Sequence, residues 1–313
     1  MAKILTLTLN PALDLTVELV RLEPGQVNRS DAMHSHAAGK GVNVAQVLAD
    51  LGHTLTVSGF LGEDNAQAFE TLFAQRGFVD AFIRVPGETR SNIKLAEQDG
   101  RITDLNGPGP MVDEAAQQAL LARLDQIAPE HDVVVVAGSL PRGVSPQWLQ
   151  GLVTRLKSLG LKVALDTSGE ALRVALAAGP WLIKPNTEEL ADALGCEVVT
   201  ERAQAHAAQR LHTEGVEHVV ISHGAEGVNW FSGGSALHAS PPKVTVASTV
   251  GAGDSLLAGM LHGLLGVHTP EQTLRTATAI AAMAVTQIGF GIHDTALLAS
   301  LEQGVRVRSL TEQ

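Results

Sequence analysis

The chain has very little cysteine and few aromatic residues. Among its 313 residues are one cysteine, no tyrosine, seven phenylalanines and three tryptophans. The single Cys196 can form neither an intrachain disulfide nor a thiolate cluster for zinc or iron and sulfur, which favours a reducing compartment. Basic residues are also scarce, at 22 against 33 acidic ones. A chain with a net charge of −11 and few stacking rings is not typical of nucleic-acid binders, so we expect no such partner.

Long hydrophobic runs are missing as well. Residues 4–9 alternate aliphatic side chains with threonine and do not resemble the apolar region of a signal peptide. The least charged stretch, residues 276–293, is interrupted by Thr286, Gln287, Gly289 and Gly291, which predicts a buried helix ending in a loop and no membrane span. We therefore expect a soluble cytoplasmic protein, long enough for one large domain or two modest ones.

Apolar, β-branched runs alternate with helical periodicity along most of the chain. Residues 132–137 form a short continuous apolar run, as expected for a parallel strand that is buried on both faces. The pattern then predicts a helix at 146–159, a strand at 162–165, a helix from 169, and strands at 181–183 and 218–221. Such repetition indicates an α/β fold with a mostly parallel central sheet flanked by helices. In these sheets, ligands bind beyond the carboxyl ends of the strands.

Two segments interrupt this order with a period of two. Residues 12–20 place Asp14 and Thr16 opposite a row of aliphatic side chains, and residues 90–96 place Arg90, Asn92 and Lys94 on one face. Because these strands have one polar face, we expect a small antiparallel sheet that serves as a lid or a dimer surface. Its strands, at about 12–36 and 88–106, would be inserted in a single domain of residues 1–313.

A glycine-rich turn, Gly251-Ala252-Gly253-Asp254, precedes an uncharged helix at about 256–265. Small residues before a helix leave its first backbone N–H groups open to an anion, and the helix dipole adds to the attraction. An aspartate there can accept a proton from a hydroxyl that attacks a phosphoryl group held by those amides. The alternative interpretation, of about equal weight, makes Asp254 an ordinary helix cap.

Four further polar loops follow predicted strands, and three of them have a structural alternative. Gly39-Lys40-Gly41 with Asn43 offers donors to a ligand, or is only a helix-starting turn. Residues 222–227 suit a phosphate or form a hairpin turn, and Gly138-Ser139-Leu140-Pro141 follows the 132–137 run. Asn186 and Glu189 have the spacing of a helix capping box, whereas Lys184 and Asn186 suit a nucleotide phosphate and Glu189 a magnesium shell.

Three familiar fingerprints are missing from the chain. There is no P-loop, because the only Gly-Lys pair is followed by Gly41. There is no Gly-x-Gly-x-x-Gly of a Rossmann dehydrogenase, and no His-Glu-x-x-His of a zinc protease.

Taken together, these motifs resemble the ribokinase-like (PfkB) carbohydrate kinases over nearly the whole chain. The likeness lies in Asn10-Pro11-Ala12-Leu13-Asp14, Gly39-Lys40-Gly41-Val42-Asn43, Gly138-Ser139-Leu140-Pro141, Lys184-Pro185-Asn186 with Glu189, and Gly251-Ala252-Gly253-Asp254. The segments 8–12 and 89–95 are most similar to the phosphosugar branch of bacterial members. The chain departs from many family members at Ala38, where a glycine is common, which weakens the case for ribose or a nucleoside.

The resemblance implies an ATP-dependent kinase that phosphorylates fructose 1-phosphate at its 6-hydroxyl, with magnesium and ATP as cofactors. Asp254 would be the general base, and Gly251, Ala252 and Gly253 the anion hole. Substrate would be bound by Asp14, Arg29, Gly39, Lys40, Asn43, Arg90, Asn92, Lys94 and Ser139, with Arg29 coming from the other subunit of a homodimer formed through the lid strands. ATP would be bound by Lys184, Asn186, Ser222, Gly224, Ala225, Gly227 and Thr249, and magnesium by Glu189 and waters, with Asp166 in a supporting role.

Several alternatives remain open at this point. A 6-phosphofructokinase or tagatose-6-phosphate kinase would use much the same groups on the opposite end of the sugar. A non-catalytic sugar-phosphate sensor would keep the same fold, and a nucleoside kinase is disfavoured by the scarcity of aromatic rings to stack on a base. The cationic face formed by Arg90 and Lys94 favours a phosphorylated sugar, although a solvated strand face would show the same pattern.

Overall fold

The computed structural model describes residues 1–310, and its centre is an 11-stranded sheet. The strand order is β15-β14-β13-β12-β11-β10-β9-β1-β4-β5, with β6 paired to β4. The bounds are β1 Lys3–Thr8, β4 Thr54–Gly62, β5 Val79–Asp80, β6 Ile83–Val85, β9 Val133–Ala137, β10 Lys162–Asp166, β11 Leu182–Ile183, β12 His218–Ser222, β13 Val228–Ser232, β14 Ser235–Ser240 and β15 Arg306–Ser309. All pairings from β5 to β12 are parallel, and β13, β14 and β15 add antiparallel strands at one edge.

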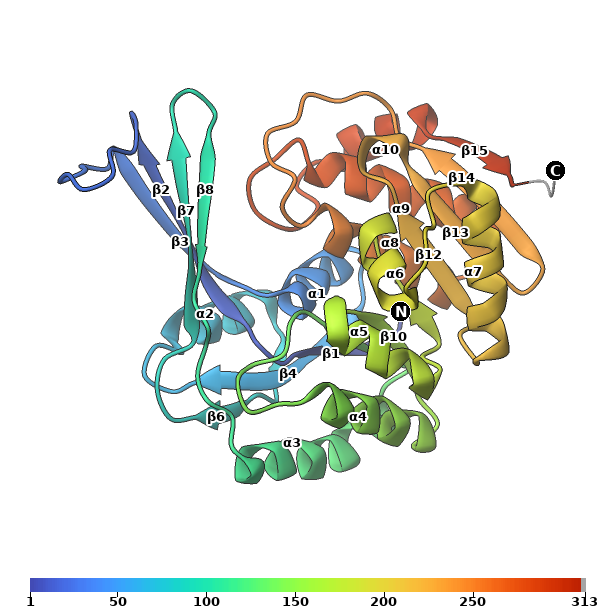
Figure 1. Ribbon diagram of the computed structural model, residues 1–313, viewed down its shortest axis with the longest axis horizontal. Coiled ribbons are helices and arrows are strands. Elements are labelled where there is room, and N and C mark those ends of the chain that lie inside the picture. The colour runs from blue at the N-terminus through green and yellow to red at the C-terminus, as the bar shows by residue number, and fades with distance from the viewer. Residues whose placement is uncertain (311–313) are drawn as a thin grey trace.

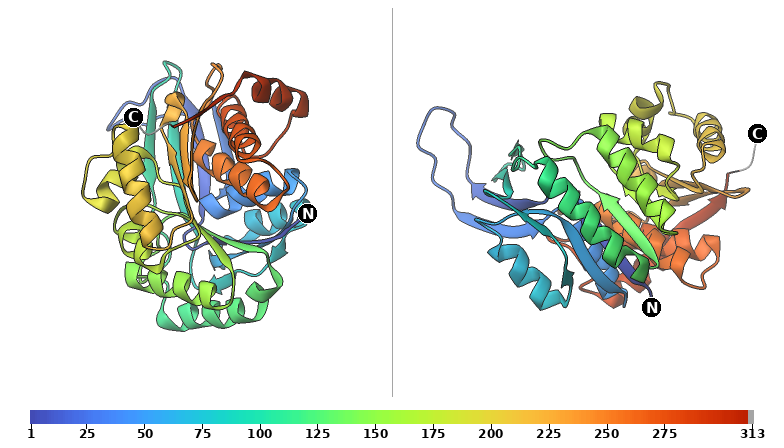
Figure 2. Two further views of the ribbon diagram at one scale, coloured as in Figure 1. Left: turned by 90° about the vertical axis from the view of Figure 1, so that its right-hand side faces the viewer. Right: turned by 90° about the horizontal axis from the view of Figure 1, so that it is seen from below.

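Helices cover both faces of this sheet (Figure 2). One face is covered by α1 (Lys40–Asp50), α2 (Gln67–Arg76), α8 (Ala252–Leu265), α9 (Pro270–Ala284) and α10 (Thr295–Gly304), and the other by α3 (Glu114–Ile127), α4 (Pro146–Ser158), α5 (Gly169–Ala175), α6 (Thr187–Leu194) and α7 (Glu201–Thr213). The strand β9 shows why both layers are needed, since Val133 and Val135 enter one core and Val134 and Val136 the other. A strand buried on both faces requires a continuous apolar run.

The strands and helices predicted from the apolar pattern are confirmed. The run at 132–137 is β9, the predicted helix at 146–159 is α4, and the strands at 162–165, 181–183 and 218–221 are β10, β11 and β12. The helix at 276–284 belongs to α9, which is followed by a loop as expected. Within residues 1–310, none of the helices combines the length and apolar character needed to span a bilayer.

The lid is a separate four-stranded sheet that projects from the main body (Figure 1). Its strands are β2 (Ala12–Leu19), β3 (Ala32–Ala38), β7 (Arg90–Glu97) and β8 (Ile102–Asn106), in the order β3-β2-β7-β8. The β2–β3 and β7–β8 pairs are antiparallel hairpins, as expected, but β2 and β7 are parallel. Both strands leave the main body in the same direction, because the chain returns through α1, β4 and α2 between them.

Candidate active site

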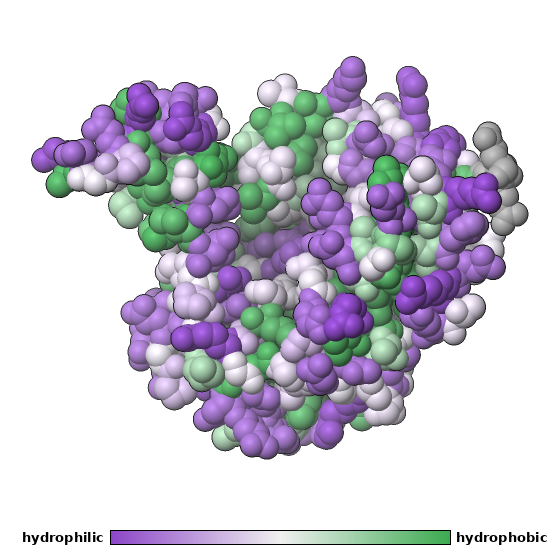
Figure 3. Space-filling model, viewed as in Figure 1, coloured by the Kyte–Doolittle hydropathy of each residue, from purple (hydrophilic) through white to green (hydrophobic). Residues whose placement is uncertain are grey.

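The predicted motifs converge where the parallel strands of the central sheet have their carboxyl ends, which we call the carboxyl edge of the sheet. The parallel strands β1, β9, β10, β11 and β12 end there, so Asn10, Ser139, Asp166, Lys184 and Ser222 follow or end neighbouring strands. This is the edge at which α/β sheets bind ligands. Figure 3 shows the molecule hollowed between the lid and the main body, with hydrophilic residues in the depth of the hollow.

The helix α8 begins at this edge and presents open backbone donors. Gly251 is its N-cap residue with a φ of 81°, and a Cβ there would lie 2.5 Å from the Phe290 ring. Both facts require glycine. No side chain caps this helix start, so the first amides, those of Ala252 and Gly253, are the unpaired donors that every helix N-terminus has. Asp254 lies in the first turn and is 5% exposed, so the alternative that makes it the N-cap is wrong.

Charges of alternating sign surround Asp254. The Lys40 ammonium lies 3.0 Å from Asp166 and 3.5 Å from Asp254, and the Lys184 ammonium lies 3.4 Å from Asp166. The amide nitrogen of Asn43 donates to Asp254 at 2.8 Å. A Cβ on Gly253 would stand 3.2 Å from the Lys184 ammonium, so this cation lies beside the open amides of α8. The arrangement provides both a carboxylate and a cationic setting for an anion.

Burial and ion pairing shift two of these groups. Burial raises the pKa of Asp254, while Lys40 and the hydrogen bond from Asn43 act in the opposite direction. For Lys40, burial disfavours the charged form, but Asp166 and Asp254 outweigh it and raise its pKa. A carboxylate with a raised pKa is a stronger proton acceptor when it is ionised, which suits a general base.

Three asparagines near this edge share one hydrogen-bonding pattern. Each amide nitrogen donates within the protein: Asn10 to Ser139 Oγ at 3.2 Å, Asn43 to Asp254 at 2.8 Å, and Asn92 to Asp14 at 3.0 Å. Each side-chain oxygen is buried and has no partner in the described part of the chain. Buried acceptors normally have partners, and the hydroxyl groups of a sugar are donors of the required kind.

The predicted cations of the lid are engaged within the protein. Arg90 donates to the carbonyl oxygens of Asn10 at 3.1 Å, Pro11 at 3.4 Å and Gly107 at 3.5 Å, and burial lowers its pKa. Lys94 forms an ion pair of 2.8 Å with Asp104 on the neighbouring strand β8. The cross-strand register confirms that Asp14, Asn92 and Lys94 share a face. Arg90 is therefore fixed where the lid joins the main body, at the rim of the site.

One predicted site residue is not brought to this edge. Arg29 lies in the exposed loop between β2 and β3, at the end of the lid strands remote from Ala12 and Asp14. Thr249 is exposed two residues before Gly251, the N-cap of α8. Gly39 is at the site, where it is the N-cap of α1 and where a Cβ would lie 2.7 Å from the Thr8 side chain.

The loops predicted for the nucleotide adopt the structural alternatives that the sequence also allowed. Asn186 and Glu189 form a capping box on α6, with hydrogen bonds of 2.8 and 2.9 Å. Residues 222–227 join the antiparallel strands β12 and β13, with a 3₁₀ turn over Gly224–Glu226 that includes Ala225 and ends at Gly227. Ser222 is paired with Asn186, so the two loops are adjacent. These structural roles do not conflict with binding, because a capped helix start also positions its side chains.

Two residues of this region were not predicted as site residues. Asn10 donates to Ser139 and to the Leu140 carbonyl, and its place in the 10–14 motif, two residues beyond β1, could have identified it. Arg142 donates two hydrogen bonds, of 2.7 and 3.1 Å, to the carbonyl of Gly109 beside Arg90. No local pattern marks Arg142, because its partner is 33 residues away. Asp166, predicted only as a supporting residue, lies at the centre of the charged group.

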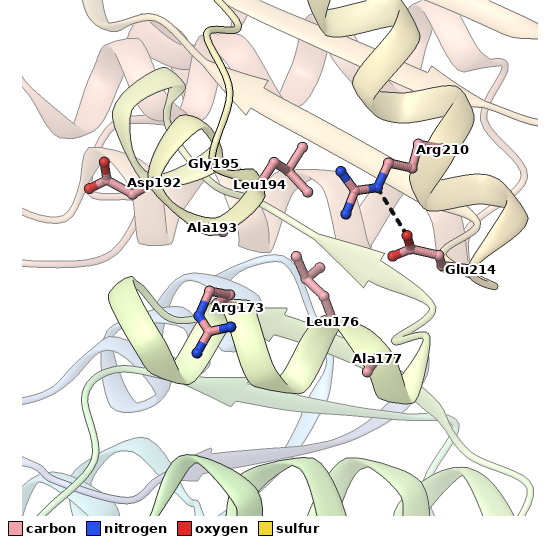
Figure 4. Close-up of a pocket in the computed structure, with 9 residues that line it drawn as sticks. All are labelled: Arg173, Leu176, Ala177, Asp192, Ala193, Leu194, Gly195, Arg210 and Glu214. Carbon is pink, nitrogen blue, oxygen red and sulfur yellow. Dashed lines mark hydrogen bonds and ion pairs between the residues drawn. The ribbon is translucent and has the colours of Figure 1, made fainter.

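Other candidate sites on the described residues are less promising. No group of three histidine, cysteine, aspartate or glutamate side chains within residues 1–310 is arranged to hold a metal ion. A surface pocket of about 640 Å³ lies between α5, α6 and α7, where Arg210 is paired with Glu214 and Leu176 faces Leu194 (Figure 4). It contains none of the residues at the carboxyl edge of the sheet.

Comparison with known proteins identifies the family. The model of the pfkB family carbohydrate kinases matches residues 7–295. The chain is 49% identical to the 1-phosphofructokinase of Vibrio cholerae over 98% of its length and 97% of the relative's, and 45% identical to that of Escherichia coli K12 over 96% of each. The structure of the tetrameric inhibited form of phosphofructokinase-2 from Escherichia coli superimposes with a TM-score of 0.87 at 28% identity, covering 97% of this chain and 99% of that one. The chain belongs to the pfkB family of carbohydrate kinases and is an ATP-dependent sugar kinase.

Proposed function

We propose that the chain transfers the γ-phosphoryl group of ATP to the 6-hydroxyl of fructose 1-phosphate, giving fructose 1,6-bisphosphate. The observation that carries this proposal is the position of Asp254, a buried carboxylate in the first turn of α8, beside open backbone amides and two lysines. The relatives named 1-phosphofructokinase support the choice of sugar. We further propose that residues 1–313 form one kinase domain into which the lid strands are inserted.

In the proposed reaction, Asp254 accepts the proton of the 6-hydroxyl as its oxygen attacks the γ-phosphorus. A new bond forms between oxygen and phosphorus, and the bond between the γ-phosphorus and the bridging oxygen breaks, leaving its electron pair on ADP. The amides of Ala252 and Gly253 face the charge on the transferring group, and Lys184 adds a cation next to them. Phosphoryl transfer depends mainly on such positioning and electrostatics.

The residues present fit a nucleotide and magnesium. Lys184, Asn186, Ser222 and the 3₁₀ turn at Gly224–Glu226 follow adjacent strands on one side of Asp254, where they would line the triphosphate. Glu189 commits one carboxylate oxygen to the Asn186 amide, so the other would face magnesium through water. Oxygen ligands and retained waters are what magnesium prefers, and the ion would neutralise phosphate charge.

The sugar phosphate would occupy the space between the lid and the main body. Asp14 and the unpartnered oxygens of Asn10, Asn43 and Asn92 would accept hydrogen bonds from its hydroxyls. Arg90 donates to three carbonyls and keeps further N–H groups, with which it would bind the phosphate together with Ser139 and Lys94. This polar environment favours a phosphorylated sugar over a neutral one.

A competition assay tests the choice of substrate. We expect kcat/KM with ATP and magnesium to be highest for fructose 1-phosphate, and lower by a factor of about 100 or more for fructose 6-phosphate and tagatose 6-phosphate, because a bound phosphate fixes which hydroxyl meets Asp254. A preference for either 6-phosphate would assign the alternative activity. Absence of turnover with every sugar phosphate would support a sensor instead.

We propose that two copies pair through the lid. Two cross-strand rows of apolar side chains lie on the face opposite to Asp14. One row is Leu15 of β2, Ile93 of β7 and Leu105 of β8, and the other is Met33 of β3, Val17 of β2 and Leu95 of β7. Met33 and Leu105 are 59% and 53% exposed. An apolar sheet face of this kind usually packs on a partner. A second copy would also be the means of bringing Arg29 to a substrate, as the family resemblance implies.

A further inference from the structure

Lys40 was predicted to bind substrate, but its ammonium group already has two partners in the protein. It lies between Asp166, at 3.0 Å, and Asp254, at 3.5 Å. The side chains of those two carboxylates are 1% and 7% exposed, whereas that of Lys40 is 40% exposed. The fold therefore brings one partly exposed cation to two nearly buried anions.

The positions of these groups are set by different elements. Lys40 is the first residue of α1, Asp166 is the last residue of β10, and Asp254 lies in the first turn of α8. The backbone of Gly138 faces the start of the Lys40 side chain, since a Cβ on that glycine would stand 3.9 Å from the Lys40 Cβ. Asp166 also lies 3.4 Å from Lys184, which holds the carboxylate between two cations. Asp166 thus limits the positions that the Lys40 ammonium can take.

This arrangement decides how the base can remain charged. Burial of a carboxylate favours its neutral form, which cannot accept a proton. Four groups face Asp254: Lys40 and Asn43 from α1, Asp166 from β10, and Lys184 after β11. A fifth group, Glu189 of α6, favours the charged form of Lys40. Of these, Lys40 is the cation in an ion pair with Asp254, while Lys184 is paired with Asp166.

We propose that Lys40 is a positioning residue that keeps Asp254 ionised and ready to accept the substrate proton, and that Asp166 holds Lys40 in place for this purpose. The proposal rests on the proposed role of Asp254 as the base. It assigns to Lys40 a task that is independent of which phosphosugar is bound.

The test compares pH profiles of kcat/KM for Lys40→Met, Lys40→Arg and the wild type. In Lys40→Met we expect the acid limb to move to higher pH by about one to three pH units, the usual effect of losing a neighbouring opposite charge. Lys40→Arg keeps the charge and should restore the limb to near its wild-type position. Lys162→Met is the matched control, because Lys162 begins the same strand β10 at the opposite end from Asp166, where its ammonium lies over the Trp181 ring at 4.9 Å from the centroid.

The result that overturns the proposal is an unchanged acid limb in Lys40→Met with a raised KM for the sugar, which would make Lys40 an ordinary substrate ligand. If Lys40→Met does not fold, Lys40→Gln is measured in its place, and the same two outcomes apply.

A second measurement separates this proposal from the proposed function. The enzyme is labelled with ¹³C at aspartate side chains, and the signal missing in Asp254→Asn is titrated in the wild type and in Lys40→Met without substrate. A shift of that titration to higher pH supports the role of Lys40 even if no sugar phosphate is turned over. If Asp254 titrates identically in the wild type and in Lys40→Met while the wild type phosphorylates a sugar phosphate, the role of Lys40 is rejected and the proposed function stands.

Discussion

At the scale of single residues, Asp254 shows how position changes the meaning of a side chain. An aspartate near a helix start is usually a cap, and local sequence supports the cap and the base interpretations of Asp254 equally. In the structure Gly251 takes the cap position, and Asp254 is buried in the first turn of α8 against Lys40 and Asn43. A carboxylate so placed stabilises the helix only modestly through the dipole, and under the proposed function it would face the reacting hydroxyl.

Replacing Asp254 by asparagine keeps the size of the side chain and removes the proton acceptor. We expect kcat to fall by a factor of about 10² to 10⁴, the usual contribution of a general base. Binding of a non-hydrolysable ATP analogue, measured by calorimetry, should change little, because the amides of α8 and Lys184 remain. Asp192→Asn makes the same change on the exposed side of α6 and should be as active as the wild type. Near-normal turnover in Asp254→Asn would reduce Asp254 to a structural residue.

At the scale of secondary structure elements, the lid is the part whose pattern was most informative. The period of two in residues 12–20 and 90–96 predicted strands with one polar and one apolar face, and the register confirms that the polar faces coincide. The parallel pairing of β2 with β7 was not predicted. It depends on the path of the intervening chain through α1, β4 and α2, which no pattern within either strand records.

The lid makes a prediction about assembly. Leu105→Lys places a charge on the exposed apolar face, so we expect the mass measured by light scattering to fall from that of a dimer to that of a monomer. Val267→Lys is the matched control, since Val267 is fully exposed in the turn between α8 and α9, away from the lid. A wild-type mass equal to one chain at micromolar concentration would contradict the proposed dimer.

At the scale of the whole molecule, the half-buried His53 and the buried His218 connect folding to pH. Burial lowers the pKa of His53 and of His218 to about 4 each, and His262 adds to the effect on His53. Both histidines have an ordinary pKa near 6.5 in the unfolded chain, so that state binds more protons between about pH 6.5 and pH 4. Their contribution to stability is complete above that window and is lost as the pH falls through it.

We therefore expect the urea midpoint of unfolding to decrease between about pH 7 and pH 5, and to decrease less in His218→Phe. Phenylalanine keeps a ring between Trp181 and Trp230, which His218 contacts at centroid distances of 4.9 and 5.7 Å. The same change at His206, an exposed position on α7, should leave the pH dependence as in the wild type. An equal decrease of the urea midpoint in His218→Phe and in the wild type would show that this histidine does not control acid stability.

Local patterns in the chain were enough to predict the α/β class, most of the strands, the lid and the motifs that meet at the sheet edge. This worked because apolar periodicity and glycine placement follow from neighbouring residues, and because parallel strands bring their carboxyl ends together. The partners of the charged side chains were decided by the fold. Lys40 lies 126 residues from Asp166 along the chain, and Asn43 lies 211 from Asp254. Only packing in three dimensions sets which charges meet, and therefore which lysine faces Asp254.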